Sequence, residues 1–317
     1  MRSNIFSVAP HKKKNHLSVA KASLRKNWDL YLLILPVIFY FLVFKYGPMY
    51  GLQIAFKDFL VTKGFMGSPF VGLKHFMRFF NSYNFGELME NTVGISLYQL
   101  AVGFPVPILL ALMVNEARVG WFKKTVQTVT YAPHFLSTVV LVGMLSVFLS
   151  PRNGLVNQVI VLLGGEPIYF MAEAAWFKTL YVFSGVWQNA GWSSIIYMAT
   201  LAGIDVQMYE AAVIDGASRL KRLIFLTIPC IVPTAVIILI MDIGRIMDVG
   251  FEKVFLMQNQ LNIGASDVIS TYVYTVGITG SQFSYSAAIG LFNSVINFAL
   301  LIVVNKASKK LTESSLW

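Results

Sequence analysis

Long apolar runs are the feature that most constrains how this chain can fold. A helix that crosses the hydrocarbon core of a bilayer needs about 20 predominantly apolar residues. The sequence contains six runs of this kind, at about residues 30–56, 91–114, 125–149, 176–201, 231–249 and 285–305. Prolines lie inside or near several of them, which membrane helices tolerate when neighbouring groups satisfy the freed carbonyls. We therefore predict an all-α, polytopic membrane protein with six transmembrane helices.

The balance of charged and apolar residues supports a membrane protein rather than a soluble one. Charged residues make up 13% of the chain and hydrophobic residues 56%, whereas soluble domains carry roughly 25% charged residues. A transmembrane β-barrel is excluded, because the apolar runs show no period-two alternation and are about twice the length of a tilted strand.

The distribution of Lys and Arg predicts the orientation. These residues concentrate in the N-terminal arm, in two connections near residues 118–124 and 219–222, and in the tail. Such residues gather on the cytoplasmic side of membrane helices, so we predict that both termini lie in the cytoplasm. The same rule accounts for the net charge of +10 without a nucleic-acid partner.

This orientation divides the chain into four predicted parts. They are a cytoplasmic basic arm (1–29), a first transmembrane helix with its outer loop (30–90), a five-helix core (91–305) that contains a cytoplasmic loop (202–230), and a cytoplasmic tail (306–317). The segment 251–284 is expected to be a polar outer loop.

Metal, disulfide and catalytic chemistry have no support in the sequence. Cys230 is the one cysteine, so no disulfide framework can form. The four histidines show no ligand spacing: His11, His16, His75 and His134. The acidic residues of the predicted outer loops have no partnering nucleophile or base: Glu87, Glu90, Glu166 and Glu173. We therefore predict no metal site and no enzyme activity.

The loop at 202–230 is a short polar segment between two apolar runs. Asp205 is placed to cap a helix over 207–215, since its carboxylate can accept from free amides of the first turn. Gly216 is expected to end that helix, and a second helical segment then leads to Pro229. The small residues Ala211 and Ala217 would let a partner approach the backbone closely. From the residues alone, the loop is either a docking surface or an ordinary connector between helices.

A sequence pattern in this loop carries a family resemblance. Glu210-Ala211-Ala212, then three residues, Gly216, nine residues and Leu226-Thr227-Ile228-Pro229 resemble the cytoplasmic EAA loop of type I ABC importer permeases. Four further segments are similar to oligo- and polysaccharide permeases, with alginate importers the most similar subgroup: 46–56, 187–197, 271–274 and 313–317.

The resemblance implies a type I ABC importer permease fold and one subunit of a larger importer in the bacterial cytoplasmic (inner) membrane. It implies a second, related but distinct permease chain, two ATPase subunits, an extracytoplasmic solute-binding protein and a saccharide substrate. The chain lacks the phosphate-binding pattern G-x-x-x-x-G-K-[ST], so ATP and Mg would belong to the partner ATPase, with no cofactor in this chain. The implied ATPase-docking residues are Glu210, Ala211, Ala212, Asp215, Gly216, Ala217 and Pro229.

Polar and aromatic residues within the apolar runs are candidates for a substrate path. Saccharides bind through hydrogen bonds to amides and through stacking on aromatic faces, and these candidates are Trp187, Gln188, Asn189, Trp192, Ser193, Tyr197, Asn293 and Asn297. The alternative is that the polar groups join packed helices by hydrogen bonds.

Asp242, Arg245 and Asp248 form a second polar group, spaced three residues apart. Intramembrane charges are candidates for a pathway or a gate, although the position of these three late in their run favours the outer end of a helix. For the chain as a whole, two alternatives stay open: an ABC permease for a non-sugar solute, and an ion-coupled secondary transporter.

Overall fold

The structure is a computed structural model that describes residues 26–117, 120–312 and 315–316. About three-quarters of these residues (77%) are helical, and the only strand-like pairing among them is an isolated bridge between Lys57 and Phe70. The chain divides into two units, Met1–Gln53 and Ile54–Trp317.

The described part of the first unit is one long apolar helix. It consists of α2 (Trp28–Tyr40), the π-helical segment η1 (Phe41–Tyr46), α3 (Gly47–Met49) and the start of the 3₁₀ segment η2 (Tyr50–Phe56). α2, η1 and α3 contain no buried residue. An apolar helix that exposes its whole circumference is suited to lipid or to another helix rather than to water.

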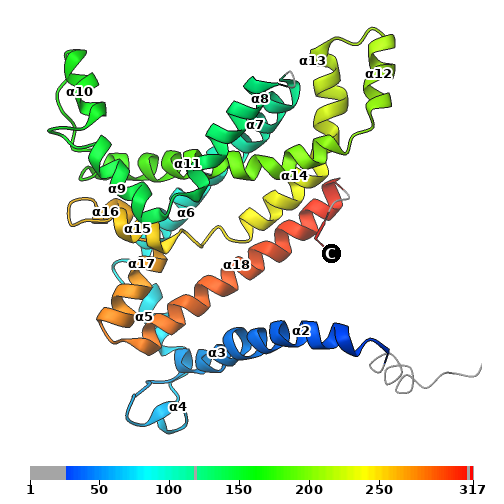
Figure 1. The fold of residues 1–317 in the computed structure, drawn as a ribbon. Coiled ribbons are helices and arrows are strands. Elements are labelled where there is room, and N and C mark those ends of the chain that lie inside the picture. Colours follow the sequence, from blue (N-terminus) through cyan, green and yellow to red (C-terminus); the bar gives the residue numbers. More distant parts are fainter. Residues whose placement is uncertain (1–25, 118–119, 313–314, 317) are drawn as a thin grey trace, which may run out of the picture. The chain divides into compact units, whose positions relative to one another are not determined.

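The second unit contains the remaining elements (Figure 1). In chain order they are α4 (Gly64–Gly67), α5 (Lys74–Phe80), α6 (Phe85–Gly103), α7 (Pro105–Glu116), α8 (Trp121–Tyr131), η3 (Ala132–Phe135), α9 (Thr138–Phe148), α10 (Leu155–Leu162), α11 (Ala174–Ala202), α12 (Val206–Ile214), α13 (Arg219–Arg222), η4 (Leu223–Thr227), α14 (Ile228–Ile243), α15 (Phe251–Met257), α16 (Ile263–Ser266), α17 (Ile269–Tyr274), η5 (Thr275–Thr279) and α18 (Phe283–Thr312).

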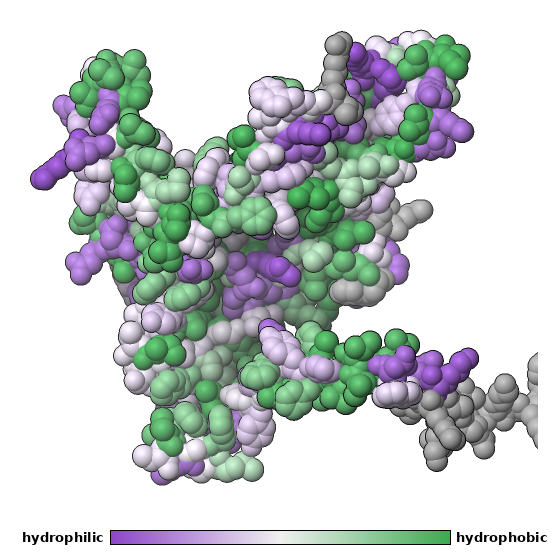
Figure 2. All heavy atoms as spheres, in the orientation of Figure 1, coloured by the Kyte–Doolittle hydropathy of each residue, from purple (hydrophilic) through white to green (hydrophobic). Residues whose placement is uncertain are grey.

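Helix α11 is the centre of this unit, since it packs against α6, α7, α8 and α14. Its approach to α8 is unusually close, because a Cβ added at Gly191 would lie 2.0 Å from the carbonyl oxygen of Thr130. One core cluster joins α6, α11 and α15 through Ile95, Phe177 and Val254. Hydrophobic side chains cover much of the face shown in Figure 2, and hydrophilic ones lie around α12 and α13.

The membrane spans agree with the sequence prediction in part. Among the described residues, four helices are long and apolar enough to cross a bilayer: Trp28–Phe56, Phe85–Glu116, Arg219–Ile243 and Phe283–Lys310. They correspond to the first, second, fifth and sixth predicted spans. The fourth predicted span lies in α11, which is not among them because Gln188, Asn189 and other polar residues dilute its apolar character. The predicted number of six is therefore not confirmed.

The third predicted span, 125–149, is broken rather than straight. Its two halves, Trp121–Phe135 and Thr138–Phe148, meet at an angle of 103°, and together they bring the count to five if they form one span. The break has a local cause. Proline at 133 interrupts the α-helical hydrogen bonds, and the hydroxyl of Ser137 accepts a bond from the amide of Val140 and so begins a new helix.

The segment 251–284 is not a simple polar loop. It contains α15, α16, α17 and η5, and Val254, Met257 and Ile269 on it are buried. It folds back onto α6, where Asn91 Nδ2 donates to the carbonyl oxygens of Gly264 at 2.9 Å and of Asp267 at 3.1 Å. The predicted loop is therefore part of the core.

Candidate functional site

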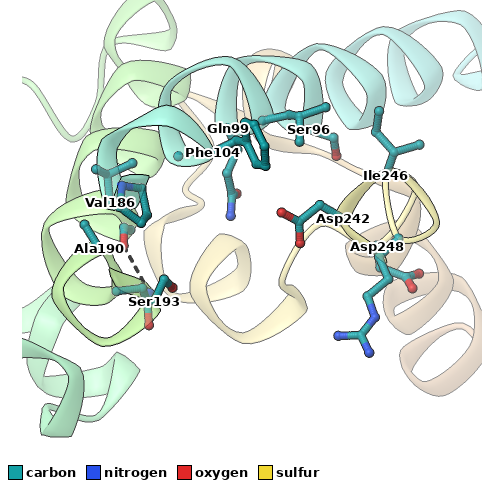
Figure 3. A pocket seen from close by; sticks show the side chains of 15 residues that line it. Ser96, Gln99, Phe104, Val186, Ala190, Ser193, Asp242, Ile246 and Asp248 are labelled. Atoms are coloured by element: carbon teal, nitrogen blue, oxygen red, sulfur yellow. Dashed lines mark hydrogen bonds between the residues drawn. The ribbon is translucent and has the colours of Figure 1, made fainter. Parts of the chain in front are cut away.

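A polar cavity of about 340 Å³ lies between α6, α7, α11 and the end of α14. Its volume is at the lower end of the range for small-molecule sites. The polar lining residues are Ser96, Gln99, Asn189, Ser193, Asp242, Arg245 and Asp248. Figure 3 shows Gln99 of α6 and Asp242 of α14 pointing toward the same space. The cavity therefore combines neutral hydrogen-bonding groups with a group of charges.

The charged group lies at the end of α14 and also faces the cavity. α14 ends at Ile243, and the chain continues as turns in which Arg245 N donates to Asp242 O and Asp248 N donates to Arg245 O. All three side chains are exposed. The ion pairs among the described residues involve Asp58 alone as the acid, so Arg245 makes none with its two acidic neighbours. Both sequence interpretations of this group thus describe part of the geometry.

The predicted path residues of α18 support this turn instead of lining the cavity. Asn293 Nδ2 donates to Asp248 Oδ1 at 3.0 Å. Asn297 is buried, and its Oδ1 accepts from the amide of Met247 at 3.0 Å. Their position one turn apart on α18 lets both amides hold the chain that follows α14.

The predicted path residues of α11 separate into two sets. Asn189 and Ser193 line the polar cavity. Gln188 instead donates to the carbonyl of Leu136 at 2.8 Å and braces the break between η3 and α9. Trp187 lines a separate apolar cavity of about 350 Å³, and Tyr197 is only 2% exposed within a core cluster.

His134 is a neighbour of this cavity that the sequence reasoning left without a role. Its Nδ1 lies 3.0 Å from Oδ1 of Asn189, and its ring stacks on Trp192 with a centroid distance of 4.6 Å. Trp192 therefore lies beside the cavity residue Asn189 without lining the cavity itself. Ser96 and Gln99 were also missed, although polar residues three positions apart in an apolar run were a usable signal.

The loop 202–230 folds as two short helical segments joined by a tight turn. Asp205 Oδ1 accepts from the amide of Gln207 at 2.9 Å, as expected for an N-cap. Gly216 has φ +72°, and the next amide, of Ala217, donates to Ala212 O at 2.9 Å. Such a left-handed residue at a helix C-terminus favours glycine. Local sequence rules therefore predicted this loop well.

The base of the loop is fixed, while its tip is open. Tyr209 of α12 and the fully buried Thr227 of η4 share a hydrogen bond of 2.9 Å between their hydroxyls. Ile214, near the tip, is 86% exposed, and Phe225 of η4 is 77% exposed. The exposed residues of the EAA pattern are Glu210, Ala211, Asp215, Gly216 and Pro229, and Ala212 and Ala217 are half-buried. Large apolar side chains beside exposed polar ones are typical of an interaction surface.

No group of three or more His, Cys, Asp or Glu side chains within the described ranges is arranged to hold a metal ion. The side chains that line the cavity offer hydrogen bonding through Gln99, Asn189 and Ser193, and charge recognition through Asp242, Arg245 and Asp248.

Comparisons with known proteins cover nearly the whole chain. Residues 103–312 match the family described as binding-protein-dependent transport system inner membrane component. The chain is 46% identical to the polygalacturonan/rhamnogalacturonan transport system permease protein YteP of Bacillus subtilis over 91% of this chain and 90% of that protein. It is 41% identical to protein LplB of the same organism over 93% of each.

Among solved structures, a chain of a bacterial alginate ABC transporter, in complex with a periplasmic protein bound to an alginate pentasaccharide, has a TM-score of 0.86 and 38% identity. The match covers 93% of this chain and 99% of that one. The all-helical type I permease fold expected from the sequence is thereby confirmed. The chain belongs to the family of inner membrane components of binding-protein-dependent transport systems, as a multi-pass transporter subunit and not an enzyme.

Proposed function

We propose that this chain forms half of the translocation path for an acidic oligo- or polysaccharide in an ATP-driven importer. Two relatives support the substrate class. YteP is named for polygalacturonan and rhamnogalacturonan, and the similar solved transporter is described as importing the acidic polysaccharide alginate. All three polymers contain uronic acids.

The proposed path is the polar cavity between α6, α11 and the end of α14. Amide groups of Gln99 and Asn189 and the hydroxyl of Ser193 line it, and they suit the hydroxyl groups of a sugar. Trp192 lies beside Asn189, with one face covered by His134. A second permease chain would supply the other half of the path, as the family resemblance implies.

The proposed energy input arrives through the loop 202–230. The observation that carries this proposal is the exposed surface of the loop. Glu210, Ile214 and Gly216 are exposed there, and a hydrogen bond between Tyr209 and Thr227 joins the two helical segments at the base. A separate ATPase, holding ATP and Mg, would dock there. ATP binding can drive transport only if the ATP-bound ATPase binds one permease conformation better than the other.

The proposed assembly has two permease chains, two ATPase subunits on the cytoplasmic side and a solute-binding protein on the outer side. Both termini of this chain would lie in the cytoplasm, as the Lys and Arg distribution predicts. The solved relative contains a periplasmic binding protein, which supports the outer partner.

Reconstitution of the complete complex in proteoliposomes tests the proposal. With ATP enclosed and the binding protein outside, uptake of a radiolabelled galacturonate or mannuronate oligosaccharide is expected, and a non-hydrolysable ATP analogue should abolish it. Uptake driven by an ion gradient without any ATPase subunit would refute the proposal, and uptake of amino acids in place of saccharides would refute its substrate class.

A further inference from the structure

A buried lysine lies directly behind the wall of the polar cavity. Lys253 of α15 is only 9% exposed. The ion pairs found among the described residues do not involve it, because both have Asp58 as the acid. A buried ammonium without a carboxylate partner is costly in free energy. The position of this charge therefore needs an explanation.

The contacts of Lys253 hold the amine in place without neutralising it. Its Nζ donates to the carbonyl oxygen of Tyr181 at 2.7 Å and lies 4.6 Å from the centroid of the Tyr181 ring, in a cation–π contact. An ammonium has three donors. The Tyr181 carbonyl takes one of them, and the remaining ones are free to bind another acceptor.

The amine reaches the cavity wall at a glycine. Gly185 of α11 lines the cavity, and a Cβ added there would lie 3.1 Å from Nζ of Lys253. Next to this point, the side-chain amide of Asn189, another lining residue, donates to the Gly185 carbonyl at 3.0 Å. A side chain at position 185 would thus stand between the amine and the cavity. Because position 185 is a glycine, the amine lies close to the cavity.

The charges around the cavity show why a second cation matters there. Asp242, Asp248 and Arg245 give the lining one net negative charge, which repels an anionic substrate. Lys253 restores neutrality. Burial lowers the pKa of Lys253 to about 8, so the amine is still mostly protonated at neutral pH.

We infer that Lys253 determines specificity, by attracting a carboxylate of the transported saccharide to the Gly185 wall of the cavity. The inference rests on the proposed function and deepens it, since it assigns the selection of uronic acids to one residue. Methionine fills similar space without the buried charge, so replacing Lys253 by methionine should not destabilise the complex.

The test compares an acidic substrate with its neutral form in reconstituted complexes. A galacturonate trisaccharide and its methyl ester are supplied to wild type, K253M, K253R and K178M. Lys178 of α11 is the matched control, because its Nζ lies 3.4 Å from a Cβ added at Gly94 of α6, which does not line the cavity. Thermal stability of each solubilised complex is measured in parallel.

K253M is expected to lower uptake of the acid by about tenfold, because it removes the attraction between the ammonium and the substrate carboxylate, and a loss of about 1.4 kcal/mol changes binding tenfold. The loss should appear as a higher KM. Uptake of the ester should change by less than about twofold, because the ester carries no negative charge that the ammonium could attract. Thermal stability should not fall. K253R should retain selectivity for the acid, and K178M should behave as wild type.

Equal loss of both substrates in K253M, or no loss of either, would overturn the inference. G185A provides a second route if K253M does not assemble, because it keeps the amine and adds a methyl group between it and the cavity; unchanged selectivity in G185A would then overturn it. If the wild type imports the ester and the acid equally well, the inference about Lys253 is wrong, but the proposed saccharide transport is still supported. Should it import neither, both proposals fail.

Discussion

Substitution of Gly216 tests how the loop 202–230 transmits force. Gly216 has φ +72°, and a Cβ added there meets nothing within 4 Å. The cost of a side chain is therefore a backbone cost and not a clash. An L-residue in the left-handed region costs about 1–2 kcal/mol, which corresponds to roughly a fivefold to thirtyfold shift away from the observed turn.

If the angle between α12 and α13 must be kept for coupling, uptake should fall by a similar factor in G216V. G216A should lose less, because Val is β-branched and bulkier. G216N is the matched control, since Asn tolerates the left-handed region better than other non-glycine residues. The assays are ATP-dependent uptake and substrate-stimulated ATP hydrolysis in proteoliposomes, with subunit stoichiometry checked first. Equal activity of G216V and G216N would refute the conformational argument.

Further predictions concern packing, topology and pH. G191A should destabilise the solubilised complex by about 1–3 kcal/mol or more, because its Cβ would meet the Thr130 carbonyl at 2.0 Å. G143A is the control and should not destabilise it, since a Cβ at Gly143 has open space. Equal melting temperatures of the two variants would contradict the close packing of α11 on α8. In a C230A background, Tyr83→Cys (96% exposed) should react with an impermeant maleimide in intact cells and Ile214→Cys only after permeabilisation, and the reverse pattern would invert the orientation. The hydrogen bond from Lys74 lowers the pKa of Asp58 below 3.8 in the folded protein. The ionised Asp58 therefore stabilises the fold above pH 3.8, and this stabilisation is lost as the pH falls through the pKa of Asp58 in the folded state. The melting-temperature difference between wild type and D58N should therefore be constant near neutral pH and shrink below about pH 3.8; a difference that grew there would contradict the assignment.

The parts of the structure that follow local rules were predictable from the sequence. Asp205 caps α12 and Gly216 ends it, and both effects act within a few residues along the chain. The apolar spans of α6, α14 and α18 follow from length and hydropathy.

The parts that depend on packing between distant segments were not predictable in the same way. Pro133 is visible in the sequence, but a bend of 103° also depends on the cap at Ser137. The burial of 251–284 was missed because its helices are too short to show a periodic apolar face. Only two of the eight predicted path residues, Asn189 and Ser193, line the cavity, because the side of a helix that faces a cavity is set by its neighbours.

Site-specific cross-linking in the intact complex tests the central claim most directly. A photoactivatable maleimide is attached at Ala211→Cys, which is exposed on α12, in a C230A background, with Tyr83→Cys as the control. We predict a cross-linked product that contains the ATPase subunit from position 211 and none from position 83. Absence of an ATPase product at 211, or modification of that position from the outer side of intact cells, would contradict the claim that this loop receives the energy of ATP hydrolysis.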